Sequence, residues 1–440
     1  NMNNLIQIEN NQLAQNILKT NYFDYFKKGN QKSLEIFLLG HCSAQCKYCY
    51  LVKHPELYPK TDLAIILDHL QLILNWYIEN HFINEIDIFS AEWLNIDSFR
   101  DKVFTIFYNS FKDSKYKPPI IVIPSNMQFI HSKNSTEKIQ EWIDLFKTIN
   151  ISICISASVD GKYCDDDRTA CDDIFYKELY NFLTHNQFLA HPMISSYNVN
   201  KWIQNYNWWL KTFPGKISNN LMTLEVRDET WTNESIQNLL EFLNYVIDYK
   251  FLHIFDKNKL EFLKYILGIH HNKEYFIPYN SIQLFSEDVF NQKDDFTCTV
   301  GHSNLTIRVG DLSIPICHRL GYDELLLGKF NVENNKITTF EVYKPELLIM
   351  KTHLKRNCLP HCESCKYIGC CTGFCMGNSY EVCKNPLIPT MEVCKMYKTK
   401  INFLISKYLQ MGLFEYLPKI KTELGDEVYT YLNDLILDIG

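Results

Sequence analysis

Three cysteines near the start of the chain have a spacing that could hold a metal cluster. Cys42, Cys46 and Cys49 form a Cys-x3-Cys-x2-Cys pattern on one short loop. Thiolates are soft ligands that select iron-sulfur clusters or zinc, and three of them can hold three corners of a cubane cluster. A structural zinc site would need a fourth ligand, and the adjacent His41 would be strained in a tetrahedron with all three cysteines. The pattern therefore favours a cluster with one open iron.

A second set of cysteines gathers in the C-terminal third of the chain. Ten of the sixteen cysteines fall between residues 298 and 394. The sequence begins without the basic and apolar stretches of a secretory signal, which predicts a cytoplasmic protein whose thiols stay reduced. We therefore expect metal binding rather than a disulfide framework. Paired zinc ribbons remain the alternative for this region.

The first cysteine loop would be positioned by alternating strands and helices. Short apolar, β-rich runs alternate with longer helical patterns from about residue 33, which is typical of βα units around a parallel sheet. Residues directly after such strands line one mouth of a barrel, where chemistry takes place. The sequence therefore predicts a partial (β/α)6, TIM-like barrel. Its six strands are expected at residues 34–39, 85–89, 120–123, 151–156, 190–194 and 221–226.

The alternation stops after residue 250. A helical stretch at 259–267 is followed by a region rich in Cys, Gly and Pro. There, residues 305–309 and 312–317 flank Gly310-Asp311 and predict a β-hairpin, with Pro315 confining its strand to a sheet edge. Residues from 395 onwards are expected to be helical.

Composition excludes several classes of protein. A hydrophobic fraction of 46% with 14% aromatic residues predicts a folded chain. No run approaches the roughly 18 apolar residues that a membrane span needs, so we expect no membrane partner. A net charge of -7 without a basic block also argues against nucleic-acid binding.

The first cysteine pattern, with Tyr48 before its last cysteine and a strand before it, resembles the radical S-adenosylmethionine (SAM) superfamily. The resemblance implies that the open iron of a [4Fe-4S] cluster on Cys42, Cys46 and Cys49 binds SAM, whose reductive cleavage gives a 5′-deoxyadenosyl radical. Ser90-Ala91-Glu92 stands where the family has Gly-Gly-Glu, and both glycines are replaced. The SAM-binding residues implied by the resemblance are Tyr48, Ala91, Glu92, Asn126, Ser158 and Arg168.

The later cysteines resemble the seven-cysteine SPASM extension of that superfamily, which carries auxiliary [4Fe-4S] clusters. Six residues separate Gly310 from Cys317, where the family usually has four. The resemblance implies three clusters in all. It assigns Cys298, Cys317 and Cys375 to the inner auxiliary cluster, and Cys362, Cys365, Cys371 and Cys394 to the outer one.

These resemblances divide the chain into five expected segments. They are an N-terminal helical segment (1–32), a radical SAM partial barrel (33–250), a helical linker (251–295), a cysteine-rich SPASM iron-sulfur domain (296–400) and a C-terminal helical tail (401–440).

His318 is the candidate catalytic side chain, although the sequence does not identify a catalytic base. His318-Arg319 follows Cys317, where sulfatase-maturing relatives typically have an aspartate, and it resembles the Cys-His-Arg of many peptide-modifying SPASM enzymes. The alternative is a histidine that is hydrogen-bonded within the hairpin. Trp202, Tyr206 and Trp209 stand at helical spacing and are expected in the core.

Three functions remain open. The first is a radical SAM oxidoreductase or cyclase that modifies a ribosomally made, Cys-containing precursor peptide by hydrogen abstraction, forming a thioether or carbon-carbon crosslink. The second is an anaerobic sulfatase-maturing enzyme that forms formylglycine. The third is a non-catalytic iron-sulfur electron carrier. Both enzymes would need SAM and an external one-electron reductant of the flavodoxin or ferredoxin type.

Overall fold

A computed structural model describes most of the chain from residue 33 onwards. The described residues are 33–58, 60–80, 85–165, 172–214, 223–224, 228–269, 281–285, 290, 304–344, 347, 359 and 361–439. They fall into two compact units. The first unit draws on residues 1–159, 167–189 and 299–353, and the second on 160–166, 190–298 and 354–440. The expected helical segment at 1–32 lies outside the described residues.

An eight-stranded sheet with the order β10-β9-β8-β7-β1-β2-β3-β4 forms the centre of the first unit. Neighbouring strands from β7 through β1 to β4 are parallel, and β7 to β10 are antiparallel to one another. The strands are β1 (Ser33–Phe37), β2 (Glu85–Asp87), β3 (Ile120–Ser125), β4 (Ser152–Ala157), β7 (Asn304–Arg308), β8 (Ser313–Pro315), β9 (Leu326–Glu333) and β10 (Lys336–Val342).

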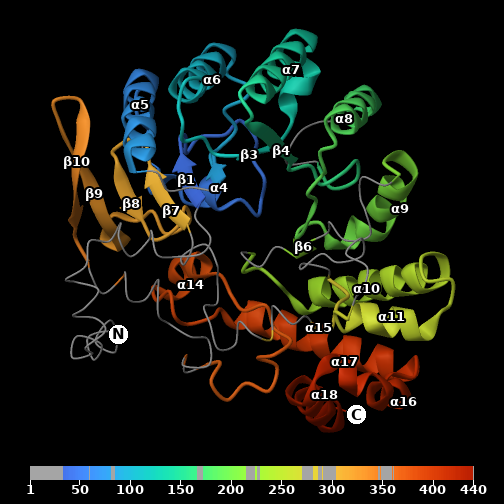
Figure 1. Ribbon diagram of the computed structural model, residues 1–440. Helices are drawn as coiled ribbons and strands as arrows, with labels where there is room; N and C mark the ends of the chain where they lie inside the picture. Colours follow the sequence, from blue (N-terminus) through green and yellow to red (C-terminus); the bar gives the residue numbers. More distant parts are fainter. Residues whose placement is uncertain are drawn as a thin grey trace. The chain divides into compact units, whose positions relative to one another are not determined.

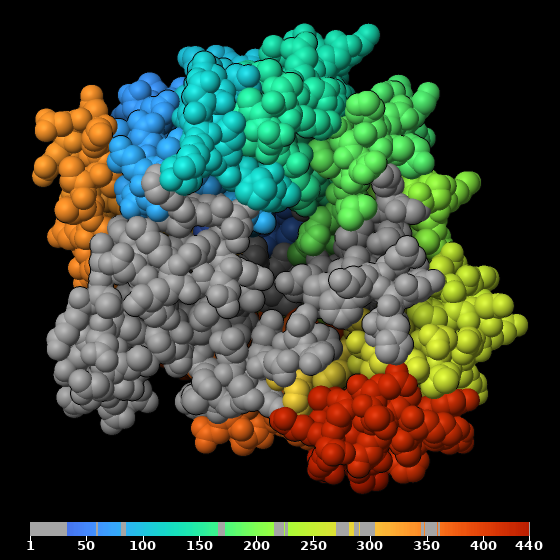
Figure 2. Space-filling view, viewed as in Figure 1, coloured from blue at the N-terminus to red at the C-terminus, as the bar shows by residue number. Residues whose placement is uncertain are grey.

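Helices connect the parallel strands of this unit. Figure 1 shows α5, α6 and α7 side by side, and their surfaces form a continuous band from blue to teal in Figure 2. The amphipathic pattern expected at 63–78 is α5, which also packs against β10. The helices are α4 (Tyr50–Lys53), α5 (Leu63–Asn80), α6 (Asp97–Phe111), α7 (Lys133–Thr148) and α8 (Asp173–Asn186), with 3-10 turns at Pro55–Leu57, Gln128–His131 and Asp323–Leu325.

The expected hairpin exists, and it extends the sheet. β7 pairs with β8 around Gly310-Asp311, and β7 also lies parallel to β1 with Glu35 opposite Thr306. The prediction that Pro315 confines its strand to an edge is wrong, because β8 lies between β7 and β9. The register shifts between Ile314 and Pro315, and such an irregularity accommodates a residue without an N–H group.

The second unit is mainly helical. The fifth and sixth expected strands form a separate parallel pair, β5 (Met193–Ile194) and β6 (Thr223–Leu224). As expected, Trp202, Tyr206 and Trp209 of α9 are fully buried. Its helices are α9 (Trp202–Thr212), α10 (Asn233–His253), α11 (Lys259–Ile266), α14 (Met376–Cys383), α15 (Met391–Gln410), α16 (Leu413–Tyr416), α17 (Lys421–Leu424) and α18 (Asp426–Ile439), with 3-10 turns at Val199–Lys201 and Leu417–Ile420.

The α/β class and all six predicted strands are confirmed, each within three residues at its start. In the part of the chain that the structure describes, no helix combines the length and apolar character that crossing a bilayer requires.

Candidate functional site

The loop that carries Cys42, Cys46 and Cys49 follows β1 in the first unit and ends where α4 begins. Gly40 opens this loop against Tyr58. A Cβ atom on Gly40 would lie 2.2 Å from the Cβ of Tyr58, so only glycine fits there. Tyr58 in turn stacks on Phe37, with ring centroids 3.4 Å apart. Backbone close packing therefore fixes the start of the cysteine loop.

The thiol of Cys42 lies beside Glu92, which is in the loop after β2. Its sulfur accepts the Ala44 N–H at 3.4 Å. Burial raises the pKa of Cys42, the backbone N–H groups of Ala44 and Glu92 lower it, and the charges of Glu92 and Cys49 raise it. The first and third predicted cluster ligands and Glu92 therefore share one electrostatic environment.

Glu92 is fixed by residues at the end of β3. Its carboxylate accepts the Asn126 N–H at 2.6 Å and the Ser125 hydroxyl at 3.0 and 3.2 Å. It also accepts the Leu94 N–H at 3.2 Å. Glu92 is only 9% exposed, so these bonds hold a buried carboxylate in one orientation.

Asn126 has one polar group left over. Its Oδ1 accepts the Gln128 N–H at 3.1 Å. Its Nδ2 is buried and makes no hydrogen bond to the described residues. A buried donor without a partner costs about 1–3 kcal/mol, so this amide has the chemistry to receive a polar ligand beside Glu92. A SAM molecule, which carries carboxylate, ammonium and hydroxyl groups, fits that need.

Gln128 connects the cysteine loop to the polar cradle, by which we mean Glu92, Ser125 and Asn126. Its Oε1 accepts the Ser43 hydroxyl at 3.2 Å and the Asn95 amide at 3.3 Å. Gln128 was not among the site residues expected from the sequence. Its position two residues after Asn126, at the carboxyl end of a predicted strand, is the signal that could have found it.

The remaining predicted SAM contacts have mixed outcomes. The Ser158 N–H donates to Ser125 O at 2.7 Å, and the Ala91 N–H donates to Leu39 O at 2.8 Å. Backbone bonds therefore link the ends of β1, β2, β3 and β4. Tyr48 is half-buried on the cysteine loop. Arg168 lies outside the described residues, so its role stays a prediction.

His318 forms a buried pair with Glu35 of β1. Its Nδ1 contacts a Glu35 carboxylate oxygen, and the other oxygen accepts the Thr306 hydroxyl at 2.7 Å. The imidazole also stacks on Phe89 with ring centroids 3.9 Å apart, and Tyr58 donates to the His318 backbone carbonyl. Sequence reasoning missed Glu35, although a single glutamate within an apolar strand is itself a signal.

The four cysteines assigned to the outer auxiliary cluster line one pocket of the second unit. Cys362, Cys365 and Cys371 come from the turns before α14, and Cys394 comes from α15. The Gly373 N–H donates to the Cys371 sulfur at 3.4 Å. The donor set is soft thiolate, as an iron-sulfur cluster requires.

These thiols interact electrostatically. The pKa of Cys394 is raised to about 11, first by burial and then by the charges of Cys371, Cys362 and Cys365, in that order, while Lys398 lowers it. Among the described residues, no three His, Cys, Asp or Glu side chains converge on one point as a single metal ion would need. A cubane cluster does not need such convergence, because each thiolate binds a different iron.

Cys370 is adjacent to Cys371 but does not line the pocket. Its thiol interacts with the Tyr431 hydroxyl, and burial followed by the charge of Cys370 raises the pKa of Tyr431. That hydroxyl also accepts the Gly369 N–H at 3.0 Å and donates to Lys366 O at 2.9 Å. Tyr431 therefore stabilises the loop of Cys370 and Cys371 through hydrogen bonds to its backbone.

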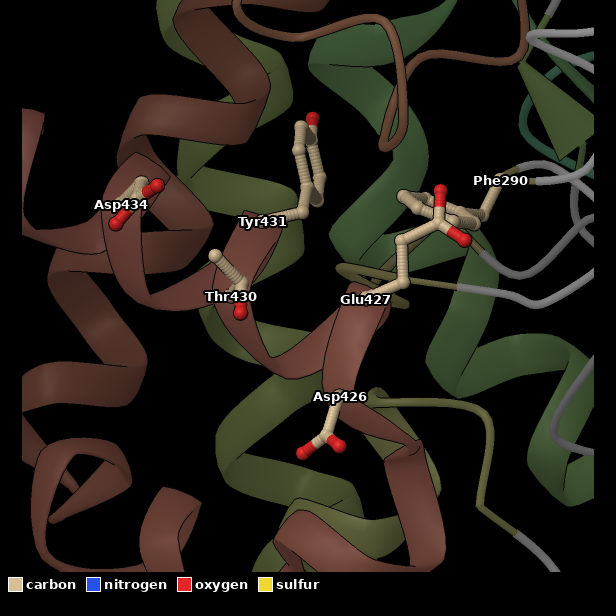
Figure 3. Close-up of a pocket in the computed structure, with 6 residues that line it drawn as sticks. All are labelled: Phe290, Asp426, Glu427, Thr430, Tyr431 and Asp434. Carbon is tan, nitrogen blue, oxygen red and sulfur yellow. The ribbon is translucent and has the colours of Figure 1, made fainter.

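A hollow of about 510 Å³ is lined in part by Tyr431. Figure 3 shows the rings of Phe290 and Tyr431 with the carboxylates of Asp426, Glu427 and Asp434 around it. Its lining holds no cysteine or histidine. The hollow is therefore distinct from the cysteine pocket and has no soft metal ligands.

The inner auxiliary set is not assembled on described residues. Cys298 lies outside them, Cys317 belongs to the first unit, and Cys375 precedes α14 in the second. This ligand set therefore stays a prediction. Of the unassigned cysteines, Cys383 is exposed, and Cys358 lies outside the described residues.

No family model and no curated protein matches the chain. Solved structures of anSMEcpe, an anaerobic sulfatase-maturing enzyme of the radical SAM SPASM type, do match. The native enzyme with bound AdoMet and Cp18Cys peptide gives a TM-score of 0.52 at 14% identity, over 86% of this chain and 98% of that chain. The complex with Kp18Cys peptide gives 0.53 at 13%, over 86% and 98%. A histidine-tagged form of the enzyme with bound AdoMet gives 0.52 at 13%, over 92% and 98%. The chain therefore shares the fold of these structures.

Proposed function

We propose that this chain is a radical SAM enzyme that modifies a peptide and uses three [4Fe-4S] clusters. The observation that carries the proposal is the position of Cys42 beside Glu92, whose carboxylate is fixed by Ser125 and Asn126. Cluster ligands and a polar cradle with a spare amide donor occur together in the first unit. An electron carrier would have no use for that cradle.

The residues of the cradle have separate tasks in this proposal. When bound, the cluster with SAM supplies a 5′-deoxyadenosyl radical that abstracts hydrogen from the substrate. Cys42, Cys46 and Cys49 hold three irons and leave the fourth open. Glu92 offers its carboxylate to the SAM ammonium, and the Asn126 Nδ2 donates to a SAM oxygen. The hydrogen bond between Ser43 and Gln128 holds the cysteine loop in position beside the cradle.

A peptide substrate is supported by the similar structures, which hold peptides. The first candidate reaction is a thioether or carbon-carbon crosslink in a Cys-containing precursor peptide. The second is formylglycine formation, which the name of the similar enzyme favours. His318, fixed by Glu35 and Phe89, is the candidate catalytic side chain in either case. An external one-electron reductant of the flavodoxin or ferredoxin type and a cytoplasmic location belong to the same proposal.

Iron content and 5′-deoxyadenosine formation test the enzymatic part. Anaerobically reconstituted wild type should hold about twelve irons, from three four-iron clusters, and form 5′-deoxyadenosine with dithionite. A Cys42→Ala, Cys46→Ala, Cys49→Ala variant should keep about eight irons and form none. A Cys154→Ala variant, altered in β4 outside every predicted ligand set, is the control and should behave as wild type. Wild-type protein that holds its full complement of iron but forms no 5′-deoxyadenosine would contradict the proposal.

Product mass separates the two candidate reactions. A crosslink removes two hydrogen atoms from the peptide. Formylglycine formation from cysteine replaces the sulfur and two hydrogens by one oxygen. The substrates to compare are a short cysteine-containing peptide encoded beside this chain and a sulfatase active-site peptide. A product from neither peptide, with 5′-deoxyadenosine formed, would leave the SAM chemistry standing and contradict the substrate class.

A further inference from the structure

A buried lysine lies close to the four-cysteine pocket. Lys400 is on α15, the helix that also carries Cys394, and it is 8% exposed. Its ammonium lies 5.3 Å from the centroid of the Tyr397 ring. Tyr397 lines the pocket and accepts a hydrogen bond of 2.9 Å from Thr372, which follows Cys371. The Lys400 ammonium therefore lies next to a residue that lines the pocket.

No carboxylate of the described residues pairs with Lys400, and the charges that act on it come from Cys371 and Cys370. Burial lowers the pKa of Lys400 to about 8, and these two cysteines raise it. A buried ion without an opposite charge costs several kcal/mol. Among the described residues, the thiolates of the pocket are the groups that can balance the charge of Lys400.

The pocket has the opposite requirement. Its four cysteines, Cys362, Cys365, Cys371 and Cys394, line one pocket, so their thiolates place like charges close together. A four-thiolate cubane cluster carries net negative charge, and reduction by one electron adds to that charge. A nearby positive charge stabilises the reduced form more than the oxidised form. Net charge close to a cluster is one of the quantities that set its reduction potential.

We propose that Lys400 is the buried counter-charge of the four-cysteine pocket and raises the reduction potential of the cluster held there. This inference rests on the proposed function. One electron passes from the external flavodoxin- or ferredoxin-type reductant to the cluster, and no bond forms or breaks. Lys400 makes that transfer more favourable. It is a positioning residue, since it acts through the cluster and not on the substrate.

Lys398 is the matched control. It also lies on α15, lines the pocket and acts on Cys394, but its side chain is exposed to water. Water and salt screen an exposed charge, so its influence on the cluster should be weaker than that of Lys400. The two lysines therefore separate the effect of burial from the effect of mere proximity.

The experiment is a potentiometric titration followed by electron paramagnetic resonance. It uses the full chain with Cys42, Cys46 and Cys49 changed to alanine, so that only auxiliary clusters contribute. The signal that disappears in a Cys371→Ser variant belongs to the four-cysteine pocket. Lys400→Met should shift the midpoint potential of that signal to more negative values. Lys400→Arg, which keeps the charge, should stay near the parent protein, and Lys398→Met should shift the potential less than Lys400→Met.

Thermal unfolding gives a second readout that needs no activity. Without iron, Lys400→Met should raise the Tm, because an unbalanced buried charge is removed. With iron, the same change should lower the Tm relative to the parent, because the counter-charge is lost. This reversal of sign would not occur if Lys400 only filled space.

The outcomes are separable. An unchanged potential in Lys400→Met at full iron content overturns the inference and leaves the proposed function intact. Loss of iron in both Lys400→Met and Lys400→Arg means that side-chain packing matters and charge does not, which also overturns it. Loss in Lys400→Met alone supports it. Failure of the parent protein to bind iron on the four cysteines contradicts the proposed clusters and the inference together.

Discussion

The cysteine loop of the first unit and the cysteine pocket of the second differ in what surrounds their thiols. The loop offers three thiols next to a polar cradle of Glu92, Ser125 and Asn126, with a spare amide donor. The pocket offers four thiols among aromatic and apolar side chains, with a lysine next to a residue that lines it. An open cluster that must bind a small molecule needs the first arrangement. A closed cluster that only gains and loses electrons is suited to the second.

The largest expected effect distinguishes two adjacent cysteines, Cys371 in the lining of the pocket and Cys370 outside it. Cys371→Ser should lose about four of the twelve irons, since a four-iron cluster loses a ligand. Cys370→Ser should keep them all, because that thiol faces Tyr431. Iron and sulfide analysis after anaerobic reconstitution measures both. Equal iron loss in the two variants would show that the cluster needs Cys370 as well as Cys371.

Glu92→Gln should weaken SAM binding about 10- to 100-fold, because hydrogen bonds to a charged group contribute about 1.5–3 kcal/mol. Glutamine keeps the size of the side chain but loses the charge that Ser125 and Asn126 now hold. Anaerobic calorimetry with SAM measures the change in Kd. Glu141→Gln, an exposed residue paired with Lys138 at 2.8 Å, is the control and should leave Kd unchanged. Equal affinities for Glu92→Gln and wild type would remove Glu92 from the SAM site.

Gly40→Ala should lower the free energy of unfolding by about 1–3 kcal/mol, the usual cost of overpacking. The new Cβ would lie 2.2 Å from the Cβ of Tyr58, so the start of the cysteine loop must move. We therefore also expect less 5′-deoxyadenosine. Denaturant unfolding and the product assay measure the two effects.

Gly412→Ala is the matched control in the second unit. Gly412 has a φ of +95° but meets no atom closer than 3.7 Å. It should cost about 1–2 kcal/mol through backbone strain alone and leave the yield per folded protein unchanged. A Gly40→Ala variant with full activity would contradict the assigned role of this close contact.

The smallest expected effect is that of Tyr431→Phe. The change removes a hydroxyl that accepts from Gly369 and donates to Lys366, which should cost about 1 kcal/mol. Iron should leave the four-cysteine pocket faster in the presence of a chelator, while the three-cysteine cluster is unaffected. Tyr429→Phe on the same helix is the control. If both clusters lost iron faster, Tyr431 would support the whole protein and not the pocket.

Much of the fold could be read from the sequence because its signals are local. Strand patterns at six places predicted β1 to β6, and the Gly310-Asp311 turn predicted the hairpin. The prediction that Pro315 lies in an edge strand was wrong, because a proline shows only that its own N–H group is missing. Whether that strand lies at an edge depends on β9, which pairs with it later in the chain.

The sequence by itself determined which thiols could act together, since ligand spacing on a loop is a property of consecutive residues. Cys42, Cys46 and Cys49 and the group from Cys362 to Cys371 are of this kind. Tertiary structure decided which side chains surround them. Glu35 meets His318 across 283 positions of the chain, and Gln128 meets Ser43 across 85. Such contacts follow from the register of parallel strands and from helix packing, which depend on the free energy of the whole core, so a local signal such as the glutamate in β1 does not identify the partner of that residue.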